Sequence, residues 1–187
     1  MKIVKKYKYY FAAALVVSGF ALIALMSYRK MGNKTASAAK QTFMERRLPI
    51  YSVSTDKPKV ALSFDAAWGN EDTKILLDIL DKYNVKVTFF MTGEWVKAFP
   101  EDVKEIQKRG HDLGNHSQNH LQMSRLSRDK CIKEIMDVHS RVKELTGVEM
   151  CLFRPPYGDY NNTLINAVEE CGYYPIQWSV DTLVTRV

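Results

Sequence analysis

Two histidines lie four residues apart in the stretch GNHSQNH, residues 114–120. At this spacing His116 and His120 can reach one metal ion from a single helical turn. Ser117 stands where the HExxH zinc proteases have a glutamate, so that protease class is not indicated. Taken alone, the pair has a second interpretation as two solvated surface histidines. The choice between the two depends on which other reactive side chains the fold brings to the same place.

An acidic residue, Asp65, and a basic residue, Arg154, are candidates to join the histidines in one site. Asp65 directly follows the apolar stretch KVALSF, residues 59–64. A carboxylate at the end of such a stretch is costly to bury, so it is explained by a chemical role, a helix cap or a buried salt bridge. Arg154 lies in FRPPYG, and a neighbouring cation keeps an aspartate ionised. The alternative for this motif is a rigid strand-to-helix turn with an exposed arginine.

The hydrophobic pattern predicts alternating strands and helices from residue 59 onward. We expect strands over 59–64, 85–91, 111–116, 151–154 and 173–180, and helices over 70–84, 100–110, 127–147 and 161–172. Repeated strand–helix units with apolar strands indicate a parallel sheet covered by helices. Asp65, His116, Arg154 and Asp181 then follow the carboxyl ends of strands, where α/β folds build their sites. His111 and His139 are expected to be structural or solvated.

The excess of positive over negative charge is confined to the N-terminal part of the chain. Residues 1–47 contain ten Lys and Arg and one acid, whereas residues 48–187 contain seventeen Lys and Arg and twenty acids. A protein that tracks phosphates would carry the excess on its folded domain. The distribution therefore argues against nucleic acid as a partner.

The N-terminal residues predict a membrane anchor. A basic tail, residues 1–8, precedes residues 9–28, which contain no charged side chain. Twenty helical residues span roughly 30 Å, the thickness of a bilayer core. The alternative is a cleaved signal peptide, but its nearest cleavage sequence, residues 36–38, lies beyond three cations. We expect an uncleaved single-pass anchor, a linker over 29–56, and an extracytoplasmic domain over 57–187.

The three cysteines, Cys131, Cys151 and Cys171, form no close pair of the kind that thiolate metal sites use. We expect them to be buried and to behave as small apolar residues. The alternative that two of them form a disulfide is left open.

Five motifs occur in order over about residues 57–183: VALSFDAAWGNEDT, VTFFMTGEWV, GHDLGNHSQNH, FRPPYGDYN and QWSVDTL. In identity and spacing they resemble the polysaccharide deacetylases, the NodB-homology domain of carbohydrate esterase family four, in its membrane-anchored bacterial form. The resemblance implies a distorted (β/α) barrel. It also implies hydrolysis of N-acetyl groups on chitin-like or peptidoglycan sugars at a divalent metal, usually zinc, with cobalt or nickel as alternatives.

The resemblance also implies a role for individual residues. Asp65 is the general base that takes a proton from the attacking water, and Arg154 orients it. His116 and His120 are metal ligands, and the backbone N–H of Tyr157 faces the developing oxyanion. The residues expected to contact or shape the substrate site are Pro155, Tyr157, Gly158 and Trp178.

The chain departs from the family pattern next to the base. The commoner pattern has a second aspartate there as the third metal ligand, whereas this chain has Ala66, which offers no lone pair. Asp65 itself, a water, Glu71 or Asp72 are the alternatives for that position.

A second departure lies at the end of the sequence. The family's D-x-x-D-W motif begins at Asp181, but Val184 and Thr185 replace its last two residues, and the later motif with a catalytic histidine does not follow. Only about five strands are expected, where a barrel has seven or eight. The pattern predicts a domain shortened by a frameshift or a truncated gene model, with little deacetylase activity.

Three functions follow for testing. The first is a metal-dependent deacetylase of cell-wall glycan. The second is an inactive remnant that at most binds glycan or a wall partner, and the third is a metal-dependent hydrolase of a different amide.

Overall fold

The computed structural model describes residues 26–27 and 45–182, and the chain divides into two compact units, residues 1–45 and 46–187. The second unit carries the expected site. Except for residues 26–27, the expected tail and anchor lie outside the described residues. Within the part that the structure describes, no helix is both long enough and apolar enough to cross a membrane.

One parallel sheet forms the centre of this unit, and its strand order is the sequence order. The strands are β1 (Ser63–Ala66), β2 (Thr88–Met91), β3 (Asp112–Asn115), β4 (Leu152–Phe153) and β5 (Tyr174–Pro175). The helices are α2 (Thr73–Lys82), α3 (Gly93–Ala98), α4 (Pro100–Lys108), α5 (Arg128–Thr146) and α6 (Asn162–Glu170). The parallel sheet and the five strands are confirmed for the described residues, and closure into a barrel stays a prediction.

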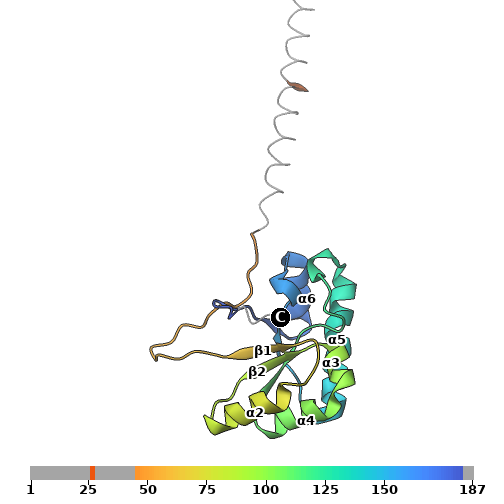
Figure 1. The fold of residues 1–187 in the computed structure, drawn as a ribbon. Coiled ribbons are helices and arrows are strands. Elements are labelled where there is room, and N and C mark those ends of the chain that lie inside the picture. The colour runs from red at the N-terminus through yellow and green to blue at the C-terminus, as the bar shows by residue number, and fades with distance from the viewer. Residues whose placement is uncertain (1–25, 28–44, 183–187) are drawn as a thin grey trace, which may run out of the picture. The chain divides into compact units, whose positions relative to one another are not determined.

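Along the chain, the helices follow one strand and precede the next. In space, α2 contacts α4, α4 contacts α5, and α5 contacts α6 (Figure 1). In α5, Cys131, Ile135, Val138 and Val142 recur every three or four residues and are all fully buried. This spacing places them on one face of the helix, which packs into the core. Gly147 ends α5 in the left-handed conformation, with a φ of 74°, as the sequence predicts.

Several boundaries differ from the expectation. The first strand covers Ser63–Ala66 rather than 59–64, so Asp65 lies inside it, and residues 59–62 are irregular and exposed. The hydrophobic pattern does not indicate helix α3, because its six residues are too few to show a period. The expected last strand, 173–180, shrinks to Tyr174–Pro175. The strands are shorter than the apolar stretches that predict them, so part of each stretch lies in the flanking loops.

The expected linker also ends earlier than residue 56. Residues 46–51 belong to the compact unit. Arg47 forms an ion pair of 2.6 Å with Glu169 of α6, and Ile50 pairs in parallel with Ile176 beside β5. The segment before the first strand therefore covers the β5 edge of the sheet.

The cysteines are all free, and only one of them is fully buried. Cys131 is buried as expected, but Cys171 is only partly buried and Cys151 is exposed, which corrects the expectation for these two. Cys151 lies just before β4, where the side chain faces solvent.

We expect the three thiols to react with Ellman's reagent at different rates at pH 8. Burial raises the pKa of Cys131 to about 11, which leaves about one thiol in a thousand ionised at that pH. Cys151 reacts first, Cys171 more slowly because burial also raises its pKa, and Cys131 only after unfolding in urea. Equal rates for all three thiols in the native protein would contradict the packing described for α5.

Candidate functional site

Three strand ends bring the predicted reactive groups together. Asp65 lies in β1, His116 directly follows β3, and Arg154 directly follows β4. Arg154 Nη1 donates a hydrogen bond of 2.7 Å to Asp65 Oδ1, and His116 Nε2 lies 3.7 Å from Asp65 Oδ2. The rings of His116 and His120 have centroids 4.9 Å apart. The geometry therefore brings these four side chains close together, and their roles stay a prediction.

Arg154 is held firmly behind the aspartate. Its side chain is only 7% exposed, and its second terminal nitrogen donates to Ser63 Oγ at 2.7 Å. The guanidinium lies over the ring of Phe90, 4.0 Å from the centroid. A buried arginine held by Ser63 and the Phe90 ring presents Nη1 to Asp65 in one geometry.

The two histidines do not share a helical turn, which corrects the geometry expected from their spacing. They lie on a loop after β3 in which Ser117 and His120 have positive φ angles of 66° and 53°. Each such residue costs roughly 1–2 kcal/mol unless the surroundings compensate. Asn115 Oδ1 accepts from Ser117 N at 3.0 Å, and Ser117 Oγ accepts from His120 N at 3.1 Å. These bonds hold the bend of the loop in which the two rings lie 4.9 Å apart.

A buried glutamate on α5 fixes the middle of this loop. Glu134 is 8% exposed, and its two carboxylate oxygens accept hydrogen bonds from the backbone N–H and the side-chain amide of Asn119, at 2.9 Å and 2.6 Å. Asn119 directly precedes His120. No sequence motif pointed to Glu134, because it lies in the middle of an ordinary amphipathic helix and reaches the site only through tertiary structure.

Replacing Glu134 with alanine is expected to lower the free energy of unfolding by about 1.5–3 kcal/mol, since two hydrogen bonds to a charged group are lost. Glu134→Gln keeps one acceptor and should lose less than half of that. Urea unfolding followed by tryptophan fluorescence measures both. Glu144→Ala removes an exposed acid from the same helix and serves as the control. A Glu134→Ala variant as stable as this control would show that the loop does not depend on α5.

The surroundings of both site histidines favour the neutral imidazole. Burial lowers the pKa of His116 and of His120, and it outweighs the opposing effect of the Asp65 carboxylate. His116 Nδ1 lies 2.7 Å from the carbonyl oxygen of Arg154, which can only accept, so Nδ1 carries the proton. The lone pair of Nε2 therefore faces Asp65. A neutral imidazole oriented by a carbonyl on its far side is the usual state of a metal-binding histidine.

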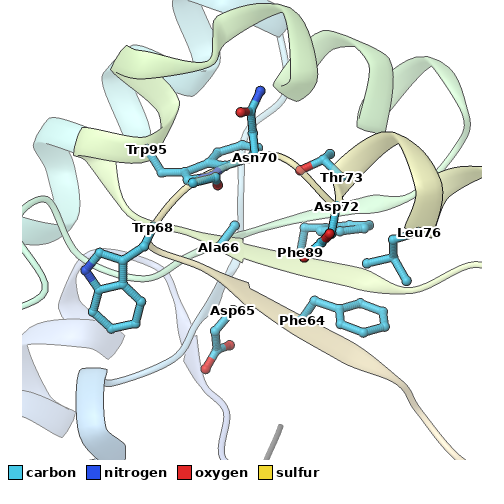
Figure 2. A pocket seen from close by; sticks show the side chains of 11 residues that line it. Phe64, Asp65, Ala66, Trp68, Asn70, Asp72, Thr73, Leu76, Phe89 and Trp95 are labelled. Atoms are coloured by element: carbon cyan, nitrogen blue, oxygen red, sulfur yellow. The ribbon is translucent and has the colours of Figure 1, made fainter. Parts of the chain in front are cut away.

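Imidazole nitrogens are ligands that suit a divalent metal, but this site offers few of them. His120 Nδ1 is buried and has no hydrogen-bond partner among the described residues. In that same part of the chain, no three His, Cys, Asp or Glu side chains are grouped closely enough to hold a metal ion. Ala66, where the family pattern has a third ligand, lines a pocket of about 140 Å³ together with Asp65 and Asp72 (Figure 2). The two imidazoles are therefore the metal-ligand nitrogens of the site, and no third side chain completes a ligand set among the described residues.

The other predicted residues surround this centre unequally. Tyr157 is 63% exposed and packs edge-on against His120, with the ring centroids 4.6 Å apart. Trp178 lies 5.5 Å from the Arg154 guanidinium and borders Gly158. Pro155 is buried, so it shapes the turn rather than offering a surface. Asp181 lies well past β5 and not at a strand end, which corrects its expected position.

The remaining histidines are structural, as expected. His111 precedes β3, is buried, and accepts a hydrogen bond of 3.4 Å from the backbone N–H of Val87. His139 of α5 shares a hydrogen bond of 2.6 Å with the hydroxyl of Tyr173.

Comparison with known proteins agrees with the motifs. The polysaccharide deacetylase family model matches residues 52–176. A peptidoglycan-N-acetylglucosamine deacetylase of Bacillus cereus is 34% identical over 142 residues, which are 76% of this chain and 52% of that protein. The structure of PdaA from Bacillus subtilis, a family 4 carbohydrate esterase, superposes with a TM-score of 0.71 at 31% identity, covering 74% of this chain and 60% of the other.

One similar structure belongs to a protein described as a pseudoenzyme. It is a pseudoenzyme of the same esterase family from Bacillus anthracis, with a TM-score of 0.70 and 33% identity over 73% of this chain and 48% of the other. A mutant of that protein is described as having restored enzymatic activity. The chain spans about half the length of the curated relatives it matches, from 42% to 60% for the first five.

Proposed function

Because the chain belongs to the polysaccharide deacetylase family, we propose that its site removes N-acetyl groups from a cell-wall glycan, peptidoglycan or a chitin-like polymer, in a metal-dependent hydrolysis. The observation that carries the proposal is the Asp65 carboxylate, fixed by Arg154 at 2.7 Å and facing His116 at 3.7 Å. An oriented carboxylate beside two neutral imidazoles provides a base next to a pair of metal-ligand nitrogens.

The protein groups divide the work of amide hydrolysis as follows. Asp65 accepts a proton from the attacking water, and Arg154 holds its carboxylate in one orientation through the hydrogen bond to Oδ1. His116 and His120 would hold a divalent ion, most simply zinc, with cobalt or nickel as alternatives. When bound, that ion supplies Lewis-acid polarisation of the amide carbonyl. The backbone N–H of Tyr157, on a strained turn with a φ of 61°, is the proposed donor to the oxyanion.

A second candidate function is glycan binding without turnover. Two observations favour it: Ala66 removes one anionic ligand from the family pattern, and one similar structure is a pseudoenzyme. With fewer ligands the ion would be held more weakly than in relatives that keep the aspartate. The two functions differ in whether acetate is produced, and they share the same substrate class.

The experiment is to measure acetate release from N-acetylated chitooligosaccharide and from peptidoglycan with added zinc, for the wild-type chain and for Ala66→Asp. The substitution introduces the aspartate that the family pattern has at this position. Acetate released by the wild-type chain supports the deacetylase. Release by Ala66→Asp alone supports the non-catalytic binder. If neither protein releases acetate or binds either glycan, both proposals are wrong.

We further propose that residues 9–28 anchor the chain to the cell membrane, with the site on the extracytoplasmic side. The length of this uncharged stretch supports the proposal. The full chain should stay in the membrane fraction after a high-salt wash and leave it only with detergent. Recovery of the protein in the salt wash would overturn the anchor.

A further inference from the structure

An exposed tryptophan lies beside the site on the loop that follows β1. Trp68 is 75% exposed, although tryptophan gains more from burial than most side chains. Figure 2 shows its indole on the same side of β1 as the Asp65 carboxylate, whereas the side chain of Ala66 points to the other side. An exposed aromatic ring next to reactive groups is more often part of a binding surface than of a core.

The loop that carries Trp68 is anchored to the fold. The next residue, Gly69, has a φ of 53° and accepts a hydrogen bond of 2.6 Å from the indole N–H of Trp95, which is 2% exposed. Asn70 donates a hydrogen bond of 2.6 Å to Asp102 of α4. Trp68 is therefore presented by a backbone that is fixed before any ligand arrives, which lowers the entropy cost of binding.

Trp68 also completes an aromatic border around His120. The ring centroids of Trp68 and His120 are 5.0 Å apart, and Tyr157 packs against the same imidazole at 4.6 Å. Both aromatic rings are mostly exposed, at 75% and 63%. Two mostly exposed aromatic rings therefore contact the same imidazole.

We propose that Trp68 binds the sugar ring of the substrate by stacking against the apolar C–H face of a hexopyranose. This proposal rests on the proposed function and names the residue that recognises its substrate. Pyranose rings with equatorial hydroxyls offer a C–H face that matches an indole in size and polarity, and the indole N–H remains free to meet a hydroxyl or solvent. The ligand class is a chain of β-linked N-acetylhexosamines.

The test is direct binding of an N-acetylglucosamine tetramer by calorimetry and by saturation-transfer NMR, so that turnover is not needed. Trp68→Ala should weaken binding by about tenfold or more, which corresponds to about 1.4 kcal/mol. Trp68→Phe keeps an aromatic face and should lose much less. Tyr83→Ala removes another exposed aromatic ring, 66% exposed at the end of α2, and should bind like the wild type. Thermal melting of each variant checks the fold.

The outcomes separate this inference from the proposed function. If the wild type binds the tetramer and Trp68→Ala binds it equally well, the role of Trp68 is wrong while the function stands. If Trp68→Ala instead changes only self-association in sedimentation, the ring serves a protein contact and the inference is also wrong. If the wild type binds no N-acetylated glycan, the proposed substrate class is wrong, and this inference is wrong with it.

Discussion

Replacing Asp65 with asparagine is expected to lower acetate release by about 10²–10⁴-fold, the usual contribution of a positioned general base. Asparagine keeps the size of the side chain and can still accept from Arg154, but it cannot take a proton from water. The bound metal should largely remain, because both imidazoles are untouched. Acetate release and zinc content, measured on the same preparation, test the two halves of this expectation.

The control for this variant is Asp129→Asn, which removes the same charge from a carboxylate that is 89% exposed at the start of α5. It should leave both acetate release and zinc content unchanged. If Asp65→Asn loses its zinc together with its activity, Asp65 is a metal ligand that substitutes for the one missing at Ala66. The role of base would then belong to another group.

The double variant His116→Ala with His120→Ala is expected to lose zinc and cobalt almost completely. The two imidazoles are the nitrogen donors of the site, and a lone carboxylate binds these ions weakly. Zinc per chain, measured by atomic emission after dialysis, should fall from near one to near zero. Since Cys151 is an exposed thiol that could bind zinc on its own, the comparison is made in a Cys151→Ser background. Unchanged zinc content in the double variant would show that the metal site lies elsewhere.

The sequence predicted the parallel sheet and the convergence of the site because both follow from local patterns. Apolar strands that alternate with amphipathic helices imply parallel pairing, and parallel pairing places every carboxyl end at one edge. His116 and Arg154 directly follow such ends, and Asp65 lies one residue before the end of β1, so their proximity followed from the order of the elements. The family motifs added the roles of these residues, which spacing alone does not contain.

The histidine loop shows where sequence reasoning stopped. Spacing by four residues matches one helical turn, but the loop instead uses positive φ angles at Ser117 and His120. The conformation depends on hydrogen bonds that Asn115 and Glu134 accept from the loop, and Glu134 lies on helix α5. Such tertiary contacts leave no period in the sequence, so neither the loop geometry nor the part played by Glu134 could be predicted.

Trp68 is a different case, because the sequence did contain a signal. It lies three residues after Asp65 in FDAAWG, inside a motif that the resemblance already singled out. A tryptophan in such a stretch is equally compatible with a core residue, and Trp95 in the next motif is one, at 2% exposed. Only the exposure of the side chain in the folded chain separates the two. Burial of single aromatic residues in loops depends on contacts that hydrophobic periodicity does not report.

The central claim is that Asp65, His116, His120 and Arg154 form one metal-dependent hydrolytic centre. Anomalous diffraction at the zinc edge from crystals grown with zinc tests it most directly. We expect one strong peak about 2.0–2.1 Å from a ring nitrogen of each histidine, next to Asp65, with Arg154 still bound to that carboxylate. A zinc peak at Cys151 or elsewhere, with none between the two histidines, would contradict the account.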